Sequence, residues 1–190
     1  SIDLSSSDVD VDALTYFAQV DGNGSASVEG STLTVTPATD YNGDIFVSVT
    51  VSDGLLSDAD SFILTVNPVN DAPVLDALSD AATDEDTDFV LTLSGNDVDG
   101  DALSYFAQVD GNSTASVDGT TLTVSPDSNY NGSILVTVTI GDGSLTDSGS
   151  FTLTVNAVND APVIASIADQ AIDEDASLTL TLSASDVDGD

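Results

Sequence analysis

Residues 131–140, Asn-Gly-Ser-Ile-Leu-Val-Thr-Val-Thr-Ile, alternate between two kinds of side chain directly after an Asn-Gly pair. The branched apolar residues from Ile134 to Ile140 occupy every second position, and side chains at that spacing share one face of a β-strand. Asn-Gly is a strong signal for a tight turn. The stretch therefore predicts a half-buried strand that begins at a turn.

A similar stretch with the same alternation occurs earlier as residues 42–51, and much of the chain repeats with it. Asp-Val-Asp begins at Asp8, Asp97 and Asp186, in steps of 89 residues. Repetition at a fixed period predicts tandem copies of one structural unit. Asn-Asp-Ala-Pro follows a strand pattern in both copies, and its proline cannot continue a hydrogen-bonded ladder. We therefore predict a repeat without its opening strand at 1–71, a complete repeat at 72–160 and the start of a third repeat at 161–190.

Further period-two runs predict an all-β chain. They cover residues 33–35, 45–51 and 62–66, and then 89–93, 122–124, 134–140 and 151–155. The complete repeat would hold about seven strands, which is the strand number of an immunoglobulin-like antiparallel sandwich. We find no helical periodicity of useful length. The predicted fold class is all-β, with tandem Greek-key β-sandwiches of this kind.

The composition is strongly acidic. The chain carries 34 Asp and Glu residues and no Lys, Arg or His, so its formal net charge is −34. Two carboxylates about 4 Å apart repel by roughly 4 kcal/mol at an effective dielectric near 20. Such a chain opposes its own compaction unless external cations neutralise it. Disorder is disfavoured, because 41% of the residues are hydrophobic and strongly patterned.

The missing residue types exclude several functions. Nucleic acid and anionic membranes are excluded as direct partners, since binding phosphate needs basic groups. Membrane insertion is not expected, because no apolar stretch approaches the roughly 18 residues of a span. The chain has no Cys, His, Lys or Arg, so the nucleophile–base pairs of acyl transfer cannot be assembled and we expect no enzyme activity. No signal peptide opens the sequence, and we interpret Ser1 as an internal position of a longer or processed protein.

The acidic turn Asp97-Val98-Asp99-Gly100-Asp101 is the candidate site. Its three carboxylates alternate around a glycine and can point to one locus, which strand packing does not require. Calcium takes six to eight oxygen ligands in flexible geometry, whereas transition metals favour the absent His and Cys. An EF-hand does not fit, because Ala102 and Gln108 stand where that loop needs Gly and Glu. Further oxygens are available from the Asn-Asp pairs, from Asp53 or Asp142, and from Asp-Glu-Asp at 84–86 and 173–175.

The ordered set of motifs resembles the cadherin-like tandem repeats of large bacterial surface and adhesin proteins. The set runs Asp-Glu-Asp, Asp-Val-Asp-Gly-Asp-Ala-Leu-Ser-Tyr, Val-Ser-Asp-Gly and Val-Asn-Asp-Ala-Pro, and it covers the whole chain. The resemblance implies calcium bound between successive repeats, in a bacterial protein located outside the cell or at its surface. It implies one ligand set of Asn70, Asp71, Asp97, Asp99, Asp101 and Asp142. It implies a second set of Glu85, Asn159, Asp160, Asp186 and Asp188.

The chain departs from the cadherin pattern at three places. The linker is one residue shorter than Asp-x-Asn-Asp-Asn, and Pro68 or Ala157 replaces its first Asp. The Leu-Asp-Arg-Glu motif has no match, although Asp40 and Asn129 lie near its place. Val11 replaces the glycine of the acidic turn in the first repeat. One or two calcium ions at each junction are therefore expected in place of three.

Two structural functions and a third class follow from these motifs. The first is a calcium-rigidified extender in a long bacterial adhesin or fibre, whose partners are neighbouring repeats. The second is a filament subunit, in which residues 161–190 supply the strand that the first repeat of an identical copy lacks. The third is a sugar-binding module. Such a module would use aromatic side chains, but core or sheet-face packing explains better the aromatic residues that recur in both repeats, Tyr16, Phe17, Tyr105 and Phe106.

Overall fold

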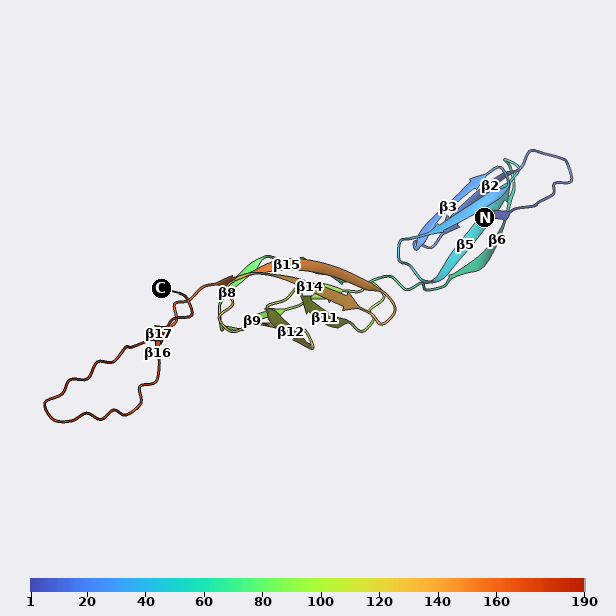
Figure 1. Cartoon of the computed structure of the whole chain (residues 1–190). Coiled ribbons are helices and arrows are strands. Elements are labelled where there is room, and N and C mark those ends of the chain that lie inside the picture. The colour runs from blue at the N-terminus through green and yellow to red at the C-terminus, as the bar shows by residue number, and fades with distance from the viewer. Residues whose placement is uncertain (190) are drawn as a thin grey trace. The chain divides into compact units, whose positions relative to one another are not determined.

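The computed structural model describes residues 1–189, and all the regular secondary structure in this part of the chain is β-strand. The chain divides into two compact units, Ser1–Asn70 and a second unit that begins at Asp71. Figure 1 shows the strands of each unit. Each unit is described by itself below.

The second unit is a two-layer β-sandwich. One sheet has the strand order β11-β14-β15-β8, and the facing sheet has the order β12-β13-β9. A short antiparallel pair, β10 with β7, extends the unit near its start. The strands are β7 (Val74–Leu75), β8 (Ala81–Asp84), β9 (Phe89–Thr92), β10 (Gly95–Asn96), β11 (Ser104–Val109), β12 (Ser113–Asp118), β13 (Thr121–Pro126), β14 (Gly132–Gly141) and β15 (Thr146–Asn156). Residues 132–140 of the alternating stretch belong to β14, one of the two inner strands of the larger sheet.

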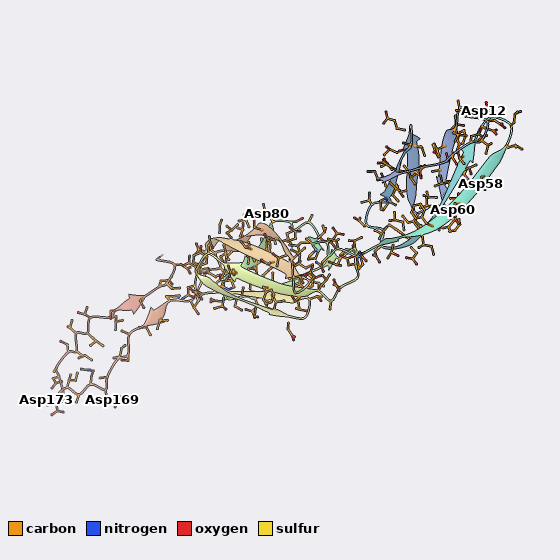
Figure 2. All side chains as sticks on the ribbon, turned by 90° about the vertical axis from the view of Figure 1, so that its right-hand side faces the viewer. Asp12, Asp58, Asp60, Asp80, Asp169 and Asp173 are labelled. Carbon is orange, nitrogen blue, oxygen red and sulfur yellow. The ribbon has the colours of Figure 1, made fainter. Side chains whose placement is uncertain are left out.

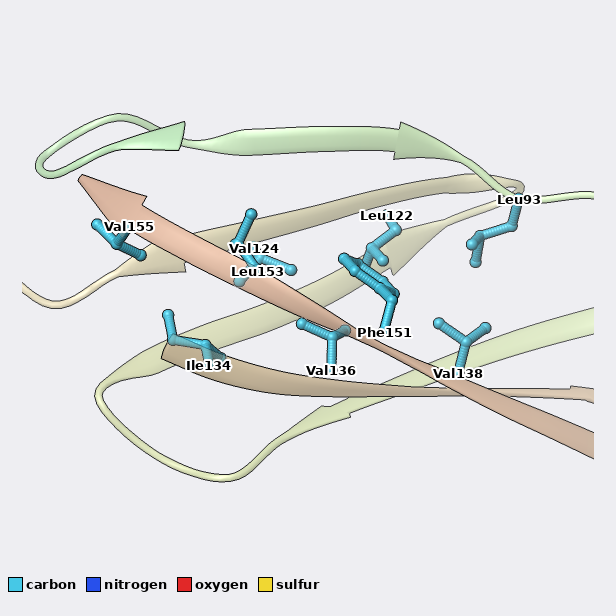
Figure 3. Packing of buried hydrophobic residues seen from close by; sticks show 9 residues of the cluster. All are labelled: Leu93, Leu122, Val124, Ile134, Val136, Val138, Phe151, Leu153 and Val155. Carbon is cyan, nitrogen blue, oxygen red and sulfur yellow. The ribbon is translucent and has the colours of Figure 1, made fainter. Parts of the chain in front are cut away.

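The core of the second unit lies between the two sheets. Figure 3 shows nine of its buried side chains. Along β13, β14 and β15 the buried residues alternate with less buried ones, as the sequence predicts. Ile134, Val136 and Val138 from β14 pack with Leu153 and Phe151 from β15. Burying a Val, Leu, Ile or Phe side chain contributes about 1.5–3 kcal/mol. This core fixes the loops at both ends of the sandwich, where the acidic residues lie.

The larger sheet contains one parallel pair among its antiparallel neighbours. β8 runs parallel to β15, with Leu153 opposite Ala81 and Asn156 opposite Asp84. The opening segment thus runs from the separate two-stranded sheet, where β7 pairs with β10, to the larger sheet, where β8 covers the edge of β15. Covering an edge satisfies backbone groups that would otherwise be open to other chains.

The first unit repeats this architecture without the opening segment. Its sheets are β2-β5-β6 and β1-β4-β3. The strands are β1 (Ile2–Asp3), β2 (Thr15–Val20), β3 (Gly24–Glu29), β4 (Thr32–Pro37), β5 (Gly43–Ser52) and β6 (Ser57–Val66). Its fully buried core is smaller and centres on Leu33, Ile45 and Val47. Within the described residues, β6 is an edge strand where β15 has β8 as a neighbour.

Residues after Pro162 form little regular structure. Only β16 (Val163–Ile164) and β17 (Ala184–Ser185) pair with one another, in the register of β7 and β10. Between them the apolar side chains of Ile167, Ile172 and Leu182 are more than half exposed. In sequence, this segment repeats the opening segment of the second unit.

The aromatic residues divide between core and surface. Tyr105 packs against the buried cluster of its unit, while Phe106 and its counterpart Phe17 point outward and are 63% and 61% exposed. Tyr130 donates a hydrogen bond to the carbonyl of Ser133 at 3.1 Å and Tyr41 donates to that of Asp44 at 2.8 Å. These two tyrosines occupy the corner positions before β14 and β5.

Candidate metal centre

Three carboxylates of the acidic turn converge in the second unit. One carboxylate oxygen each of Asp97, Asp99 and Asp101 lies within 4.8 Å of the others. Oδ1 of Asp97 accepts the backbone N–H groups of Asp99 at 2.9 Å and Asp101 at 3.3 Å, which folds the turn around that carboxylate. Gly100 has a φ of +81°, a left-handed conformation that glycine adopts without strain. The alternation of acids around this glycine therefore gathers the carboxylates as the sequence predicts.

Asp97 is the residue of this cluster whose surroundings best suit a bound cation. Its side chain is only 9% exposed. Its second oxygen, Oδ2, is buried and has no hydrogen-bond partner among the described residues. A buried polar atom without a partner costs roughly 1–3 kcal/mol, and more when it is charged. A bound cation would supply the missing partner and offset the repulsion among the three carboxylates.

The linker is tied to this cluster by its backbone. The N–H of Asp71 donates a hydrogen bond to Oδ2 of Asp99 at 2.8 Å. The side chain of Asp71 therefore begins next to the acidic turn within the second unit. Asn70 is the last residue of the first unit and stays a predicted ligand.

Asp142 has a turn-forming role in addition to its predicted one. Its Oδ1 accepts the N–H groups of Ser144 at 2.5 Å and Leu145 at 2.7 Å, which closes the turn between β14 and β15. Asp53 closes the equivalent turn of the first unit in the same way, and these hydrogen bonds lower the pKa of Asp53. The three-acid cluster within 4.8 Å does not include Asp142. Its contribution as a ligand stays a prediction.

The second predicted ligand set surrounds the linker at Asn159 and Asp160. The N–H of Asp160 donates to Oδ2 of Asp188 at 2.6 Å, and the N–H of Asp188 donates to Oδ1 of Asp186 at 2.9 Å. These bonds repeat those of Asp71, Asp99 and Asp97. The side chain of Asn159 donates its amide to the carbonyl of Asp160 at 2.8 Å, which leaves its oxygen as the atom it can offer a cation.

Glu85 reaches this linker from the other end of the second unit. Its side chain is only 5% exposed, and Oε1 accepts the N–H of Val158 at 2.5 Å. The neighbouring N–H of Glu85 donates to the carbonyl of Asn156 at 2.9 Å. Glu85 therefore lies at the boundary between the end of β15 and the linker, as the resemblance implies.

Two further residues, Asp86 and Asn129, lie beside this second set. The side-chain amide of Asn129 lies between Asp86 and Asp160, within 3.3 Å of an oxygen of the first and 3.2 Å of an oxygen of the second. Burial raises the pKa of Asp160, and the nearby charges of Asp188, Asp86, Glu85 and Asp186 raise it further. In the sequence, Asp86 belongs to the Asp-Glu-Asp motif at 84–86, and Asn129 lies near the place of the Leu-Asp-Arg-Glu motif. Their convergence on Asp160 depends on how the turn before β14 folds back, which no local pattern shows.

The chemistry of both sets suits calcium. They offer carboxylate and amide oxygens without nitrogen or sulfur ligands, and calcium accepts a flexible number of such oxygens. The residues present therefore fit a calcium ion. Asp97, Asp99 and Asp101 would hold it in one set, and Glu85, Asp160, Asp186 and Asp188 in the other.

Comparison with known families confirms the predicted fold. Residues 4–67 match the family model of the cadherin-like domain, and residues 70–154 match that of the bacterial Ig domain. The all-β immunoglobulin- and cadherin-like architecture, and the resemblance stated from the motifs, are therefore confirmed. Domains of both families are typical of extracellular and cell-surface proteins, and the cadherin-like fold generally binds calcium.

The most similar proteins include larger molecules. The chain is 31% identical to the protein named Chitinase A of Pseudoalteromonas piscicida over 163 residues, which is 82% of this chain and 19% of that protein. The solved structure of human protocadherin-24 EC1-2 aligns with a TM-score of 0.53 at 17% identity, over 81% of this chain and 86% of that one. An endo-fucoidan hydrolase of glycoside hydrolase family 107 aligns with a TM-score of 0.37 at 20% identity, over 78% and 24%. The protocadherin match shows the fold, and the chain spans about a fifth of the curated relative.

No helix within residues 1–189 is long and apolar enough to cross a membrane.

Proposed function

We propose that this chain is a calcium-rigidified extender segment of a long extracellular or surface-attached bacterial protein. The observation that carries the proposal is the buried Oδ2 of Asp97, which has no hydrogen-bond partner among the described residues and belongs to a cluster of three carboxylates. A charged oxygen in that position is stabilised by a cation more than by solvent, which cannot reach it.

Calcium at these sites would act on the connection between repeats. Each set combines a linker residue, Asp71 or Asp160, with an acidic turn of the following repeat. An ion that binds both parts would restrict the linker, and it would also reduce the self-repulsion of a chain with a net charge of −34. Extracellular modules bind calcium at roughly 0.1–1 mM, which suits an environment outside the cell.

The sequence similarity of the repeats favours a role in setting length. Sites for separate ligands would be expected to diverge, whereas the acids and the strand pattern recur here at the same positions. The segment itself lacks the His, Lys, Arg and Cys side chains of acyl-transfer catalysis. We therefore assign a structural role to this segment. The assignment also holds if the segment is part of a larger enzyme.

Small-angle X-ray scattering of the chain in calcium and in a chelator tests this function. Calcium is expected to narrow the distribution of interatomic distances and to make it bimodal, because two units at a fixed separation replace a flexible pair. Magnesium at equal concentration is the control for general screening. Identical curves in calcium and chelator would contradict the proposal.

A second candidate function is a filament subunit assembled head to tail by β-strand addition. Residues 163–173 repeat the segment that contains β7 and β8, and β8 pairs with the edge of β15 in the second unit. The same segment supplied by another copy would add a strand to β6. Size-exclusion chromatography with light scattering tests this function, since a strict monomer at all concentrations would remove it.

A further inference from the structure

A pocket opens in the second unit between the opening segment and β9, the edge strand of the smaller sheet. It has a volume of about 320 Å³, and its walls come from residues 76–81 and 89–94. Pockets for small ligands begin at roughly 300 Å³ and combine an apolar lining with a few placed polar groups. The lining shares no residue with either predicted calcium set. We call this site the β9 pocket.

The floor of the β9 pocket is apolar. Leu78, Phe89 and Leu91 pack against the buried core of the unit but stay only partly buried themselves, and Leu93 belongs to that core. The ring of Phe89 lies 5.9 Å from the ring of Phe151, measured between centroids. The core therefore holds the floor in place, and the floor leaves apolar surface open to a ligand.

A carboxylate stands at each end of the wall that the opening segment forms. Oδ2 of Asp76 accepts a hydrogen bond from the hydroxyl of Ser94, and the N–H of Asp76 donates to the carbonyl of Ser94 at 3.0 Å. Oδ1 of Asp80 accepts the N–H of Thr152 at 2.7 Å. Figure 2 labels Asp80 at the surface of the second unit. The other oxygen of each carboxylate makes no hydrogen bond within residues 1–189, so it can accept one from a ligand.

The charges of the β9 pocket select a ligand with two positive ends. Asp76 and Asp80 are four positions apart, so their Cα atoms lie at most about 14 Å from one another. The chain has no Lys or Arg that could neutralise them. A metal ion would leave the apolar floor in water, and an uncharged hydrocarbon would leave the carboxylates unpaired. Ala165 occupies the position of Asp76 in the following repeat, so the pair is not a feature of every repeat.

We propose that the β9 pocket binds a short aliphatic diamine. One ammonium group would donate to Asp76 and the other to Asp80, each through the carboxylate oxygen that the fold leaves open. Hydrogen bonds between charged groups of this kind are stronger than neutral ones. The methylene chain between the ammonium groups would lie on Leu78, Phe89 and Leu91, where it is removed from water. The ligand is thus recognised by two charges and by the apolar surface between them.

Titration of the full chain with putrescine, a linear aliphatic diamine, tests this site by NMR. Physiological ionic strength screens exposed charges that are more than about 8 Å apart, and calcium in excess competes for the acidic turns. Butylamine has one ammonium group and butanediol has none, so these two compounds are the comparison ligands. Chemical shifts of Leu78, Phe89 and Leu91 report binding in the pocket, and their dependence on concentration gives the Kd.

Two neutral variants remove the charges one at a time. Asp76→Asn and Asp80→Asn each keep an oxygen for the existing hydrogen bond, from Ser94 in the first case and from Thr152 in the second, so both variants are expected to fold. Glu29→Gln is the matched control, because Glu29 is an exposed acid at the end of β3 in the first unit. It changes the net charge by the same amount.

Putrescine is expected to bind roughly tenfold more tightly than butylamine, because it makes a second ion pair, and butanediol should cause no comparable shifts. Asp76→Asn and Asp80→Asn should each reduce the affinity for putrescine to about that for butylamine. Glu29→Gln should leave it unchanged.

Three results would overturn the site. The first is an equal affinity for putrescine and butylamine. The second is a set of shifts that spreads over the acidic loops and omits Leu78, Phe89 and Leu91. The third is an equal loss of affinity in Glu29→Gln and in the two Asp→Asn variants. Each would show that amines are attracted by the net charge of the chain alone.

Discussion

The backbone N–H of Asp160 donates a hydrogen bond to Oδ2 of Asp188 at 2.6 Å, and this bond holds the linker against the acidic turn of the following repeat. Asp71 makes the same bond to Asp99 at 2.8 Å. The two bonds recur 89 residues apart and involve the residues that the resemblance implies as calcium ligands. In both linkers the backbone thus holds one predicted ligand residue beside two others.

Replacing Asp97 should separate calcium-dependent stability from intrinsic stability. Asp97→Asn removes a buried charge, so the melting temperature in chelator is expected to stay equal or rise. The gain in melting temperature from calcium should fall, because a site saturated at 100 times its Kd contributes about 2.7 kcal/mol. Thermal melting in calcium and in chelator measures both.

Asp118→Asn is the matched control for this substitution, because Asp118 is an exposed acid at the end of β12. It changes the net charge equally and should leave the calcium response intact. An equal loss in both variants would show that calcium acts through general screening.

Val11 is expected to destabilise the first unit. It has a φ of +66° where the equivalent Gly100 and Gly189 have +81°. The left-handed conformation costs an L-residue roughly 1–2 kcal/mol, whereas glycine loses about 0.5–1 kcal/mol through the entropy of the unfolded chain. Val11→Gly should therefore raise the free energy of unfolding by up to about 1 kcal/mol, measured by chemical denaturation.

Two further substitutions check this reasoning. Gly100→Val should destabilise the second unit, because it creates the same strain there. Val9→Gly changes an equally exposed valine that lacks a positive φ and should give no gain. A gain from Val9→Gly equal to that from Val11→Gly would contradict an origin in backbone strain.

Gly132 lies under the ring of Tyr130. A Cβ at Gly132 would lie 2.8 Å from the Tyr130 hydroxyl, and its φ is +145°. Gly132→Ala is therefore expected to destabilise the second unit by about 1–3 kcal/mol. In a double-mutant cycle with Tyr130→Phe, part of this loss should be recovered, since the clashing oxygen is gone. Full additivity of the two losses would show that the clash is unimportant.

The pH dependence of the calcium-free protein should reflect Asp160. Its pKa is raised above the usual 3.8 by burial and then by Asp188 and other acids. A carboxyl with a raised pKa binds protons more strongly in the folded state, so its unfavourable contribution is present at neutral pH. That contribution disappears as the pH falls through the raised pKa.

Comparison of wild type with Asp160→Asn in chelator isolates this group. The variant is expected to be the more stable at neutral pH, and the difference should shrink on acidification. In calcium the wild type should be more stable than the variant, because Asn is a weaker calcium ligand than Asp. A difference that is constant with pH would contradict the assignment to Asp160.

Local patterns predicted the strands and the acidic turns for physical reasons. The alternation from Ile134 to Ile140 reports the two faces of one strand, and Asp97-Val98-Asp99-Gly100-Asp101 gathers its acids through bonds between near neighbours. Both features depend on a few adjacent residues. Both can therefore be predicted from the local sequence.

The features that sequence did not predict join distant parts of the chain. The parallel pairing of β8 with β15 connects residues about 70 positions apart, and short polar strands such as β12 carry little hydrophobic signal. The approach of Asn129 to Asp86 and Asp160 likewise depends on three separate loops. The outward direction of Phe17 and Phe106 follows from the strand register, which composition does not set.

Anomalous diffraction from a crystal grown in calcium tests the proposed metal centre at the atoms concerned. A calcium peak is expected beside Oδ2 of Asp97, with oxygens of Asp99 and Asp101 at roughly the 2.3–2.6 Å distances of calcium ligands. The same crystal form of Asp97→Asn should lose that peak. A wild-type crystal with no anomalous peak at this position, and with Oδ2 of Asp97 bonded to an ordered water, would contradict calcium binding at this turn.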